Sequence, residues 1–270
     1  MKFITGKTFH GLKSGSLRVL LHQMVATELT PIEKAKRDAA YACAKQHVKP
    51  GCRLGVGSGS TVRYLVEFLE SEYKGGRLPG LLCVPTSQCT KQWLIESGLP
   101  LSDLDSSPCL DVCIDGADEV DSSLRIIKGG GGCLAREKIV QHAAAKFLVI
   151  ADYSKKSSRL GEKYPNLPIE VLPFATTPLC REISSRFGGS ATLRMAARKC
   201  GPVITDNAGY IIDWNFPKDI DHDWNAIQGS LSSTPGIVET GLFLGVADGV
   251  FFAQADGAII EIKREDTSSP

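Results

Sequence analysis

The sequence lacks the features that would assign it to a membrane, a disulfide-rich or a nucleic-acid-binding class. No apolar run approaches the roughly 18 residues that a transmembrane helix needs. Nine cysteines are present, but their number is odd and no C-x-x-C pair occurs, which argues against a zinc site or a disulfide framework. The formal net charge is only +1, from 31 basic and 30 acidic residues, so a polyanion-binding surface is not expected.

These absences predict a cytoplasmic protein with reduced thiols that binds neither a membrane nor a nucleic acid. The N-terminal segment departs from the balanced charge, because its first 27 residues carry Lys2, Lys7, Lys13 and Arg18 but no acidic residue. Such a profile is found in organelle-targeting peptides and in unstructured extensions. We expect residues 1–29 to form a flexible extension, and the targeting alternative stays open.

The rest of the chain alternates apolar runs with helical patterns. A helix is predicted from Pro31, with Thr30 as its N-cap. The run "CRLGV" then leads through a glycine-rich turn into another helix, and the pattern repeats as far as "KFLVIAD". Alternation of this kind predicts a parallel sheet whose ligands bind at the carboxyl ends of the strands.

After about residue 160 shorter strand-like runs and two helical patterns follow, with a turn signal at 205–209 between two strands. The predicted fold class is therefore α/β, with a Rossmann-like main domain built on a parallel sheet and a smaller α+β domain. We assign residues 30–160 and 241–270 to the main domain and residues 161–240 to the smaller one.

The stretch "GVGSGST" has the composition of an anion-binding turn. Its glycines expose backbone N–H groups, Ser58, Ser60 and Thr61 add hydroxyls, and the start of a helix follows. It is not a P-loop, because no G-K-[ST] occurs, so a small phosphorylated ligand is favoured over nucleotide hydrolysis. The alternative is an ordinary turn between a strand and a helix.

Four carboxylates gather in "CIDGADEVD", which contains Asp115, Asp118, Glu119 and Asp121 at the end of a predicted strand. Carboxylates this close raise the pKa values of one another unless a cation or hydrogen bonds compensate. The cluster suits proton transfer, sugar-hydroxyl binding or a divalent metal, and the alternative is a solvated acidic turn.

A lysine, four glycines and a helix form the stretch "IIKGGGGCLAREKIV". Lys128 is predicted at the next strand end of the same sheet, and Lys155 follows a later strand in "ADYSKK". In the helix, Leu134, Ala135, Ile139, Val140, Ala143 and Ala144 form the predicted apolar stripe, and Glu137 lies off it, facing either solvent or a cleft. Each charge alone is compatible with an ordinary surface position, but several polar clusters at strand ends of one sheet indicate a site.

Taken together, the motifs resemble those of the type A ribose-5-phosphate isomerases. They are "GVGSGST", "PTS", "IDGADEVD", "KGGGGCLAREKIV", "ADYSK", "PIEVLPF", "LRMA", "GPVITDN" and "PGIVETGLF", and they span about residues 31–263 in the expected order. The resemblance implies an aldose-ketose isomerase that interconverts D-ribose 5-phosphate and D-ribulose 5-phosphate through an enediolate, in the non-oxidative branch of the pentose phosphate pathway. It also implies a homodimer or homotetramer, and neither cofactor nor metal.

The resemblance further implies roles for particular residues. Glu137 matches the general base, Asp115 is expected to assist ring opening, and Lys128 is expected to stabilise negative charge on the sugar oxygens. The implied substrate-binding residues are Ser58, Gly59, Ser60, Thr61, Asp115, Gly116, Ala117, Asp118, Lys128, Gly129, Gly130, Gly131 and Lys155. A family lysine in the first helix has two candidate neighbours, Lys36 and Arg37. The rival readings are a non-catalytic sugar-phosphate sensor and an acyl-CoA transferase-like enzyme.

Overall fold

The computed structural model describes residues 29–264, of which those from Pro31 onward belong to one compact unit. The predicted N-terminal extension lies outside the described residues, apart from Leu29. No helix among the described residues is long and apolar enough to cross a membrane.

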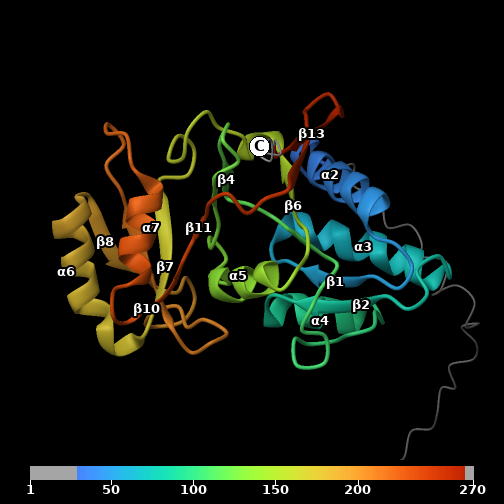
Figure 1. The fold of residues 1–270 in the computed structure, drawn as a ribbon, viewed down its shortest axis with the longest axis horizontal. Coiled ribbons are helices and arrows are strands. Elements are labelled where there is room, and N and C mark those ends of the chain that lie inside the picture. Colours follow the sequence, from blue (N-terminus) through green and yellow to red (C-terminus); the bar gives the residue numbers. More distant parts are fainter. Residues whose placement is uncertain (1–28, 265–270) are drawn as a thin grey trace, which may run out of the picture. The chain divides into compact units, whose positions relative to one another are not determined.

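The main sheet has six strands, and every neighbouring pair except β12 and β13 is parallel (Figure 1). In spatial order its strands are β13 (Ile259–Lys263), β12 (Gly249–Ala253), β6 (Phe147–Asp152), β3 (Val112–Asp115), β1 (Arg53–Val56) and β2 (Leu82–Pro85). The predicted α/β class with a mostly parallel sheet is confirmed. The last two described strands, β12 and β13, belong to this sheet although they follow the strands of a second, four-stranded sheet in the sequence.

Helices cover the two faces of the main sheet. They are α2 (Pro31–His47), α3 (Ser60–Lys74), α4 (Gln88–Glu96) and α5 (Leu134–His142), and a short 3-10 helix η1 (Tyr153–Lys155) follows β6. Because side chains alternate along a strand, β6 contributes to two cores. Ile150 packs into the core that α2 and α3 share, whereas Val149 packs on the opposite face with Val140 of α5.

The apolar stripe of α5 is narrower than predicted. Ile139 was assigned to it, but its side chain is 56% exposed. The helix ends at His142, so Ala143 and Ala144 follow it rather than extend the stripe. The face next to Leu134 and Val140 is instead completed by the buried carboxylate of Glu137. A carboxylate is therefore buried while an isoleucine of the same helix is exposed, which is unfavourable for packing and indicates a functional role for Glu137.

A second sheet is antiparallel and has four strands. In spatial order they are β10 (Ile237–Thr240), β7 (Asn166–Val171), β9 (Tyr210–Asn215) and β8 (Ser190–Leu193). Helices α6 (Thr176–Phe187) and α7 (Trp224–Ser232) and the 3-10 helix η2 (Pro173–Ala175) belong to the same part of the chain. Its core centres on Trp214, which packs against Phe187 and Phe216. The domain boundaries at 160 and 240 stay a prediction.

The turn at 205–209 has the predicted position but not both predicted strands. Only β9 follows it, and residues 203–204 before it are not part of a strand. The Thr205 N–H donates to the Gly209 carbonyl at 2.9 Å, and the Gly209 N–H donates to the Thr205 hydroxyl at 3.0 Å. The Thr205 hydroxyl thus accepts from a backbone N–H that a neighbouring strand would otherwise satisfy, and threonine hydroxyls often bond the backbone in this way in turns.

Three short strands form a separate antiparallel sheet, in the order β11 (Leu242–Phe243), β5 (Ile126–Ile127) and β4 (Glu119–Val120). The prediction that the run before Lys128 belongs to the parallel sheet is therefore wrong. The two residues of β5 pack in different cores: Ile126 in the core of the main sheet and Ile127 in that of the four-stranded sheet. Pairing with β11 allows one run to serve both cores.

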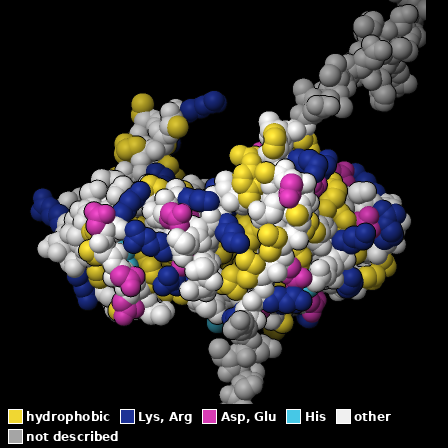
Figure 2. All heavy atoms as spheres, turned by 90° about the horizontal axis from the view of Figure 1, so that it is seen from above, with side chains coloured by type: hydrophobic (Ala, Val, Ile, Leu, Met, Phe, Trp, Pro, Cys, Tyr) yellow, Lys and Arg dark blue, Asp and Glu magenta, His cyan; other side chains and the backbone are white. Residues whose placement is uncertain are grey.

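On the face shown in Figure 2, lysine and arginine side chains are interspersed with aspartate and glutamate. This distribution agrees with the near-zero net charge of the sequence. Charges of mixed sign produce no extended positive potential on this face.

Candidate active site

A cavity of about 160 Å³ lies at the carboxyl ends of β1 and β3. The residues that line it are Lys36, Ser58, Gly59, Ser60, Thr61, Gly116, Ala117, Asp118, Lys128, Gly129, Gly130, Gly131, Glu137 and Lys155. These include every residue expected from the sequence except Asp115, which lies beneath the surface. Segments as far apart in the sequence as Lys36 and Lys155 are thus brought together, as expected for strand ends of an α/β sheet.

Asp115 ends β3 and is fully buried. Its Oδ1 accepts hydrogen bonds from the Ser58 N–H at 2.9 Å and the Gly116 N–H at 2.7 Å. The loop after β1 passes so close that a Cβ atom at Gly57 would lie 2.0 Å from this same oxygen. Glycine at position 57 is therefore required for the anion-binding turn to hold Asp115 in place.

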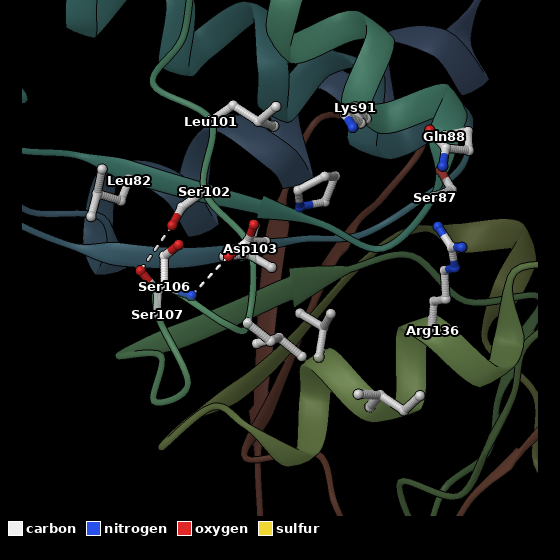
Figure 3. A pocket seen from close by; sticks show the side chains of 15 residues that line it. Leu82, Ser87, Gln88, Lys91, Leu101, Ser102, Asp103, Ser106, Ser107 and Arg136 are labelled. Carbon is white, nitrogen blue, oxygen red and sulfur yellow. Dashed lines mark hydrogen bonds between the residues drawn. The ribbon is translucent and has the colours of Figure 1, made fainter. Parts of the chain in front are cut away.

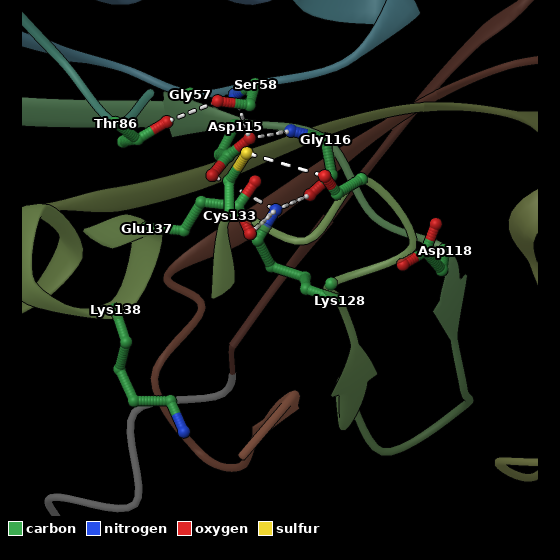
Figure 4. A network of polar contacts seen from close by, with 12 residues as sticks. Gly57, Ser58, Thr86, Asp115, Gly116, Asp118, Lys128, Cys133, Glu137 and Lys138 are labelled. Atoms are coloured by element: carbon green, nitrogen blue, oxygen red, sulfur yellow. Dashed lines mark hydrogen bonds and ion pairs between the residues drawn. The ribbon is translucent and has the colours of Figure 1, made fainter. Parts of the chain in front are cut away.

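Lys128 lies between two carboxylates, as Figure 4 shows, and is only 3% exposed. Its Nζ is 3.0 Å from Asp115 Oδ2 and 3.4 Å from Glu137 Oε2, and it donates a hydrogen bond to the Gly116 carbonyl at 2.7 Å. Burial opposes its charge, but the two carboxylates outweigh burial and hold the pKa of Lys128 above its ordinary value. A permanent positive charge therefore faces the cavity.

Glu137 lies in the first turn of α5 and is 5% exposed. Its Oε2 accepts no hydrogen bond from any described residue and is held by the ion pair with Lys128 alone. Burial and the negative charge of Asp115 raise the pKa of Glu137 to about 8, although Lys128 acts in the opposite direction. A carboxylate with this pKa is a strong enough base to take a proton from carbon next to a carbonyl, and it still ionises near neutral pH.

Burial also raises the pKa of Asp115, against the effect of Lys128 and of the two N–H groups. The three charged groups form one coupled system in which two negative charges share one positive charge. Such a system holds a proton in the pH range where enzymes work, which is typical of acid-base sites.

The four glycines form a tight turn between Lys128 and α5. Gly129 and Gly132 have φ values of 105° and 80°, which favour glycine, and the Gly132 N–H donates to the Gly129 carbonyl at 2.9 Å. The Gly130 N–H donates to Asp118 Oδ2 at 2.7 Å. The backbone therefore forms one wall of the cavity and fixes Asp118 against it.

Another part of the cavity lining suits an anion. Helix α3 begins at Ser60, its N-cap residue is Gly59, and no side chain caps its first N–H groups. Free N–H groups at a helix N-terminus bind phosphate, and Lys36 and Lys155 also line this cavity. Arg37 is not among the residues that line this cavity, and its guanidinium lies 3.5 Å from Asp38. Of the two candidates in the first helix, Lys36 is therefore the one at the site.

The hydroxyl of Ser58 was expected to contact the ligand, but it is hydrogen-bonded within the protein. It lies 2.8 Å from the Thr86 hydroxyl and donates to the Ser87 hydroxyl at 2.7 Å. Ser58 thus orders the loop after β1 through the start of α4, while its N–H holds Asp115.

This arrangement matches a known family. The family described as ribose 5-phosphate isomerase A (phosphoriboisomerase A) matches residues 82–257. A probable ribose 5-phosphate isomerase of Caenorhabditis elegans is 64% identical over 236 residues, which are 87% of this chain and 94% of the relative. The chain belongs to the ribose 5-phosphate isomerase A family. The ribose-5-phosphate isomerase of Homo sapiens is 45% identical over 86% of this chain and 74% of its own length.

Solved structures of ribose 5-phosphate isomerases have the same fold. A D-ribose-5-phosphate isomerase in complex with phospho-erythronic acid superposes with a TM-score of 0.82 at 38% identity, over 86% of this chain and 99% of the other. The ribose 5-phosphate isomerase from Plasmodium falciparum also gives a TM-score of 0.82, at 29% identity, over 87% of this chain and 100% of the other.

Sequence reasoning missed one arginine that contacts the glycine wall of this cavity. Arg194, which follows β8, donates from Nη1 to the Gly129 carbonyl at 2.9 Å and to the Gly130 carbonyl at 3.0 Å. Its Nε donates to Asp213 at 2.7 Å. The motif "LRMA" had been noted as typical of the family, but no spacing rule places a residue of the four-stranded sheet against the glycine turn.

A larger hollow, of about 660 Å³, lies beside the isomerase site between α4, α5 and the edge strand β2 (Figure 3). Asp103 is the one carboxylate among its described lining residues, and the Ser106 N–H donates to it at 2.8 Å. The hollow therefore lacks the paired carboxylates and the buried lysine of the smaller cavity. Its larger volume therefore does not make it the better candidate for acid-base chemistry.

Proposed function

We propose that this chain interconverts D-ribose 5-phosphate and D-ribulose 5-phosphate by proton transfer between C2 and C1, with Glu137 as the base. The observation that carries the proposal is the buried Glu137 carboxylate, 3.4 Å from the Lys128 ammonium, at the bottom of a cavity that also presents a helix N-terminus. Base, cation and phosphate site are the three groups that this reaction needs.

The reaction begins with the open-chain aldose. Glu137 takes the proton from C2, the electrons of that C–H bond form the C1–C2 double bond, and the carbonyl oxygen O1 gains negative charge. Lys128 stabilises this charge, because its ammonium faces the cavity and keeps its proton. Glu137 then returns the proton to C1, while the proton on O2 moves to O1, which gives the ketose without net consumption of acid or base.

Ring opening precedes proton transfer, because ribose 5-phosphate is mainly a cyclic hemiacetal. We assign this step to Asp115, whose Oδ2 accepts no hydrogen bond from a described residue and is held by Lys128 at 3.0 Å. The phosphate is assigned to the N-terminus of α3 with Lys36 and Lys155. Binding energy at this non-reacting end orients C1 and C2 between Glu137 and Lys128.

Two further observations support this assignment. Phospho-erythronic acid, which a structural relative binds, has a phosphate at one end and a carboxylate at the other. Such a molecule suits a cavity that is lined by both a helix N-terminus and Lys128. A sugar-phosphate sensor needs the phosphate site, but it gains nothing from a carboxylate whose pKa is raised to about 8.

The direct test is a coupled assay for ribulose 5-phosphate formation from ribose 5-phosphate by the purified protein. We expect turnover that is unchanged by a chelator, because the Lys128 ammonium supplies the positive charge at the sugar oxygens. Binding of ribose 5-phosphate without turnover would support the sensor instead.

We extend the proposal to the cell: a cytoplasmic homo-oligomer that acts in the non-oxidative branch of the pentose phosphate pathway. Light scattering on the purified chain measures the oligomeric state. Imaging of the chain with and without residues 1–27 measures whether that segment directs it to an organelle.

A further inference from the structure

The two sequence neighbours of Glu137 point away from the cavity and contact other parts of the fold. Arg136 donates from Nε to Asn207 Oδ1 at 2.7 Å and from Nη2 to the Asp206 carbonyl at 2.6 Å. In Figure 3 it rises from α5 towards Gln88 at the start of α4. These contacts join α5 to the turn at 205–209.

That turn is itself firmly held. Glu170 of β7 is fully buried, and its Oε1 accepts hydrogen bonds from the Thr205 hydroxyl at 2.7 Å and the Asn207 side-chain amide at 3.0 Å. On its other side, Asp206 accepts a hydrogen bond from the Gln88 N–H at 2.8 Å. A turn fixed at both ends is a rigid support for the Arg136 guanidinium.

Lys138 makes the corresponding contacts to a different strand. Its Nζ donates to Glu239 Oε1 and to the Thr240 carbonyl, both at 2.7 Å, and lies 4.8 Å from the centre of the Phe243 ring. Glu239 and Thr240 belong to β10. Figure 4 shows the Lys138 side chain directed away from the polar network that contains Glu137 and Lys128.

The helix between these two anchors is short. With nine residues, α5 is well below the roughly 12–15 residues at which an isolated helix becomes stable in water. It also carries a carboxylate that would gain hydration by turning towards solvent. Successive side chains of a helix point about 100° apart, so Arg136 and Lys138 extend on opposite sides of Glu137. Because each is hydrogen-bonded to another segment, rotation of α5 about its axis in either direction would break one set of contacts.

We propose that Arg136 and Lys138 are positioning residues, which hold Glu137 against the reacting carbons by fastening α5 to the turn before β9 and to β10. This inference rests on the proposed role of Glu137 as the base. The four-stranded sheet and its turn would then support catalysis, although that sheet contributes no described residue to the lining of the cavity. Misplacement of a reacting group by about 1 Å lowers a rate by about a hundredfold, so a modest loosening of α5 has a measurable effect.

The test is the variant Arg136→Ala, assayed with ribose 5-phosphate in the full chain. We expect kcat to fall at least about tenfold while KM changes by less than about twofold, because the phosphate site does not involve α5. Arg136→Lys keeps one donor and should recover part of the loss. The matched control is Arg77→Ala, which removes a guanidinium that donates to Glu72 at 2.6 and 2.9 Å on the surface, and kcat should stay unchanged.

A second arm removes the acceptor and leaves the arginine. Asn207→Ala removes one of the two acceptors of Arg136, together with the amide donor to Glu170, and should lower kcat less than Arg136→Ala does. The double variant should be about as slow as Arg136→Ala alone, because the contact between Arg136 and Asn207 is already broken in that variant. Additive losses, an unchanged kcat in Arg136→Ala, or a loss confined to KM would each overturn the inference. If Arg136→Ala does not fold, Arg136→Lys and Asn207→Ala take its place, since each keeps one partner of the contact: a smaller but measurable fall in kcat with unchanged KM is then expected, and an unchanged kcat in both overturns the inference.

Lys138→Met offers an independent measurement at the other anchor. It removes both hydrogen bonds to β10 and retains the apolar stem over Phe243, so kcat should fall with little change in KM. An unchanged kcat here would restrict positioning to Arg136 and contradict the two-sided anchor. Absence of turnover in the unmodified protein would reject the proposed function itself, which separates the two failures.

Discussion

Two pairs of buried carboxylates, Glu119 with Asp121 and Asp115 with Glu137, differ in the number of hydrogen bonds that they accept. Glu119 and Asp121 accept full sets of hydrogen bonds: Glu119 from the N–H groups of Gly161 and Lys163, and Asp121 from the Arg125 side chain and nearby N–H groups. Asp115 and Glu137 each retain an oxygen with no hydrogen bond from a described residue and share one lysine.

The difference shows how one kind of side chain serves structure in one place and chemistry in the other. Hydrogen bonds from N–H groups stabilise the charged form of a carboxylate and fix its position. Burial with few such bonds leaves the proton affinity of Glu137 high, with a pKa of about 8. Glu119 and Asp121 hold loops together, and Asp115 and Glu137, the proposed catalytic pair, remain able to exchange protons.

Removing the base should produce the largest effect. Glu137→Gln keeps the shape of the side chain but cannot accept a proton, so we expect kcat to fall about 10³-fold with KM nearly unchanged. The exposed Glu96 is the control, since Glu96→Gln at the end of α4 should leave kcat unaltered. Near-normal turnover in Glu137→Gln would assign the base to another residue.

The pH dependence should show the next largest effect. Glu137 must be ionised to act as the base, and burial together with Asp115 has raised its pKa to about 8. Below that pH the ionised fraction falls about tenfold per unit, so kcat/KM at pH 6 should be about a hundredfold lower than its plateau. A pH profile of kcat/KM measures this acidic limb, and a midpoint near 4.5 would show that the carboxylate is well solvated.

Substitution in the pair of Glu119 and Asp121 should affect stability and not turnover. Glu119→Ala leaves the Gly161 and Lys163 N–H groups without their acceptor, at 2.6 and 2.7 Å in the native protein, and should lower the free energy of unfolding by about 3 kcal/mol. Denaturant unfolding measures the loss, and kcat per folded molecule should be unchanged. A large drop in kcat without a loss of stability would show that Glu119 takes part in catalysis and is not only structural.

The glycine turn should give the smallest effect, and it provides its own control. Gly129→Ala forces a residue with a side chain into a φ of 105° and brings its Cβ to 2.7 Å from Leu134, so a loss of about 2 kcal/mol is expected. At Gly131 no heavy atom lies within 4 Å of the added Cβ, and Gly131→Ala should change stability by less than about 0.5 kcal/mol. Thermal unfolding compares them, and equal losses would contradict the assigned geometry.

Much of this site could be predicted from the sequence because its parts are local motifs. The glycines next to Ser58, the run that contains Asp115, and the turn after Lys128 each follow a strand, and the edge of a parallel sheet brings such segments together. The exception is instructive: Lys128 follows β5, which lies outside the main sheet, yet it still reaches Asp115. The location was correct although the strand assignment was wrong.

The contacts made by Arg194, Arg136 and Lys138 could not be predicted in the same way. Each joins α5 or the glycine turn to the four-stranded sheet, across about 65 to 102 positions in the sequence. Periodicity reports which residues share a face of one element, and it contains no information about which other element packs there. The choice between Lys36 and Arg37 was open for the same reason.

The sequence alone determined the elements, the motifs and the chemical types present, because helix and strand periods, glycine turns and the spacing of charges are local properties of the chain. Only the tertiary structure decided which carboxylates share a lysine and have raised pKa values. The pKa of Glu137 depends on how completely it is buried and on its distance from Asp115 and Lys128, and packing of distant segments sets both.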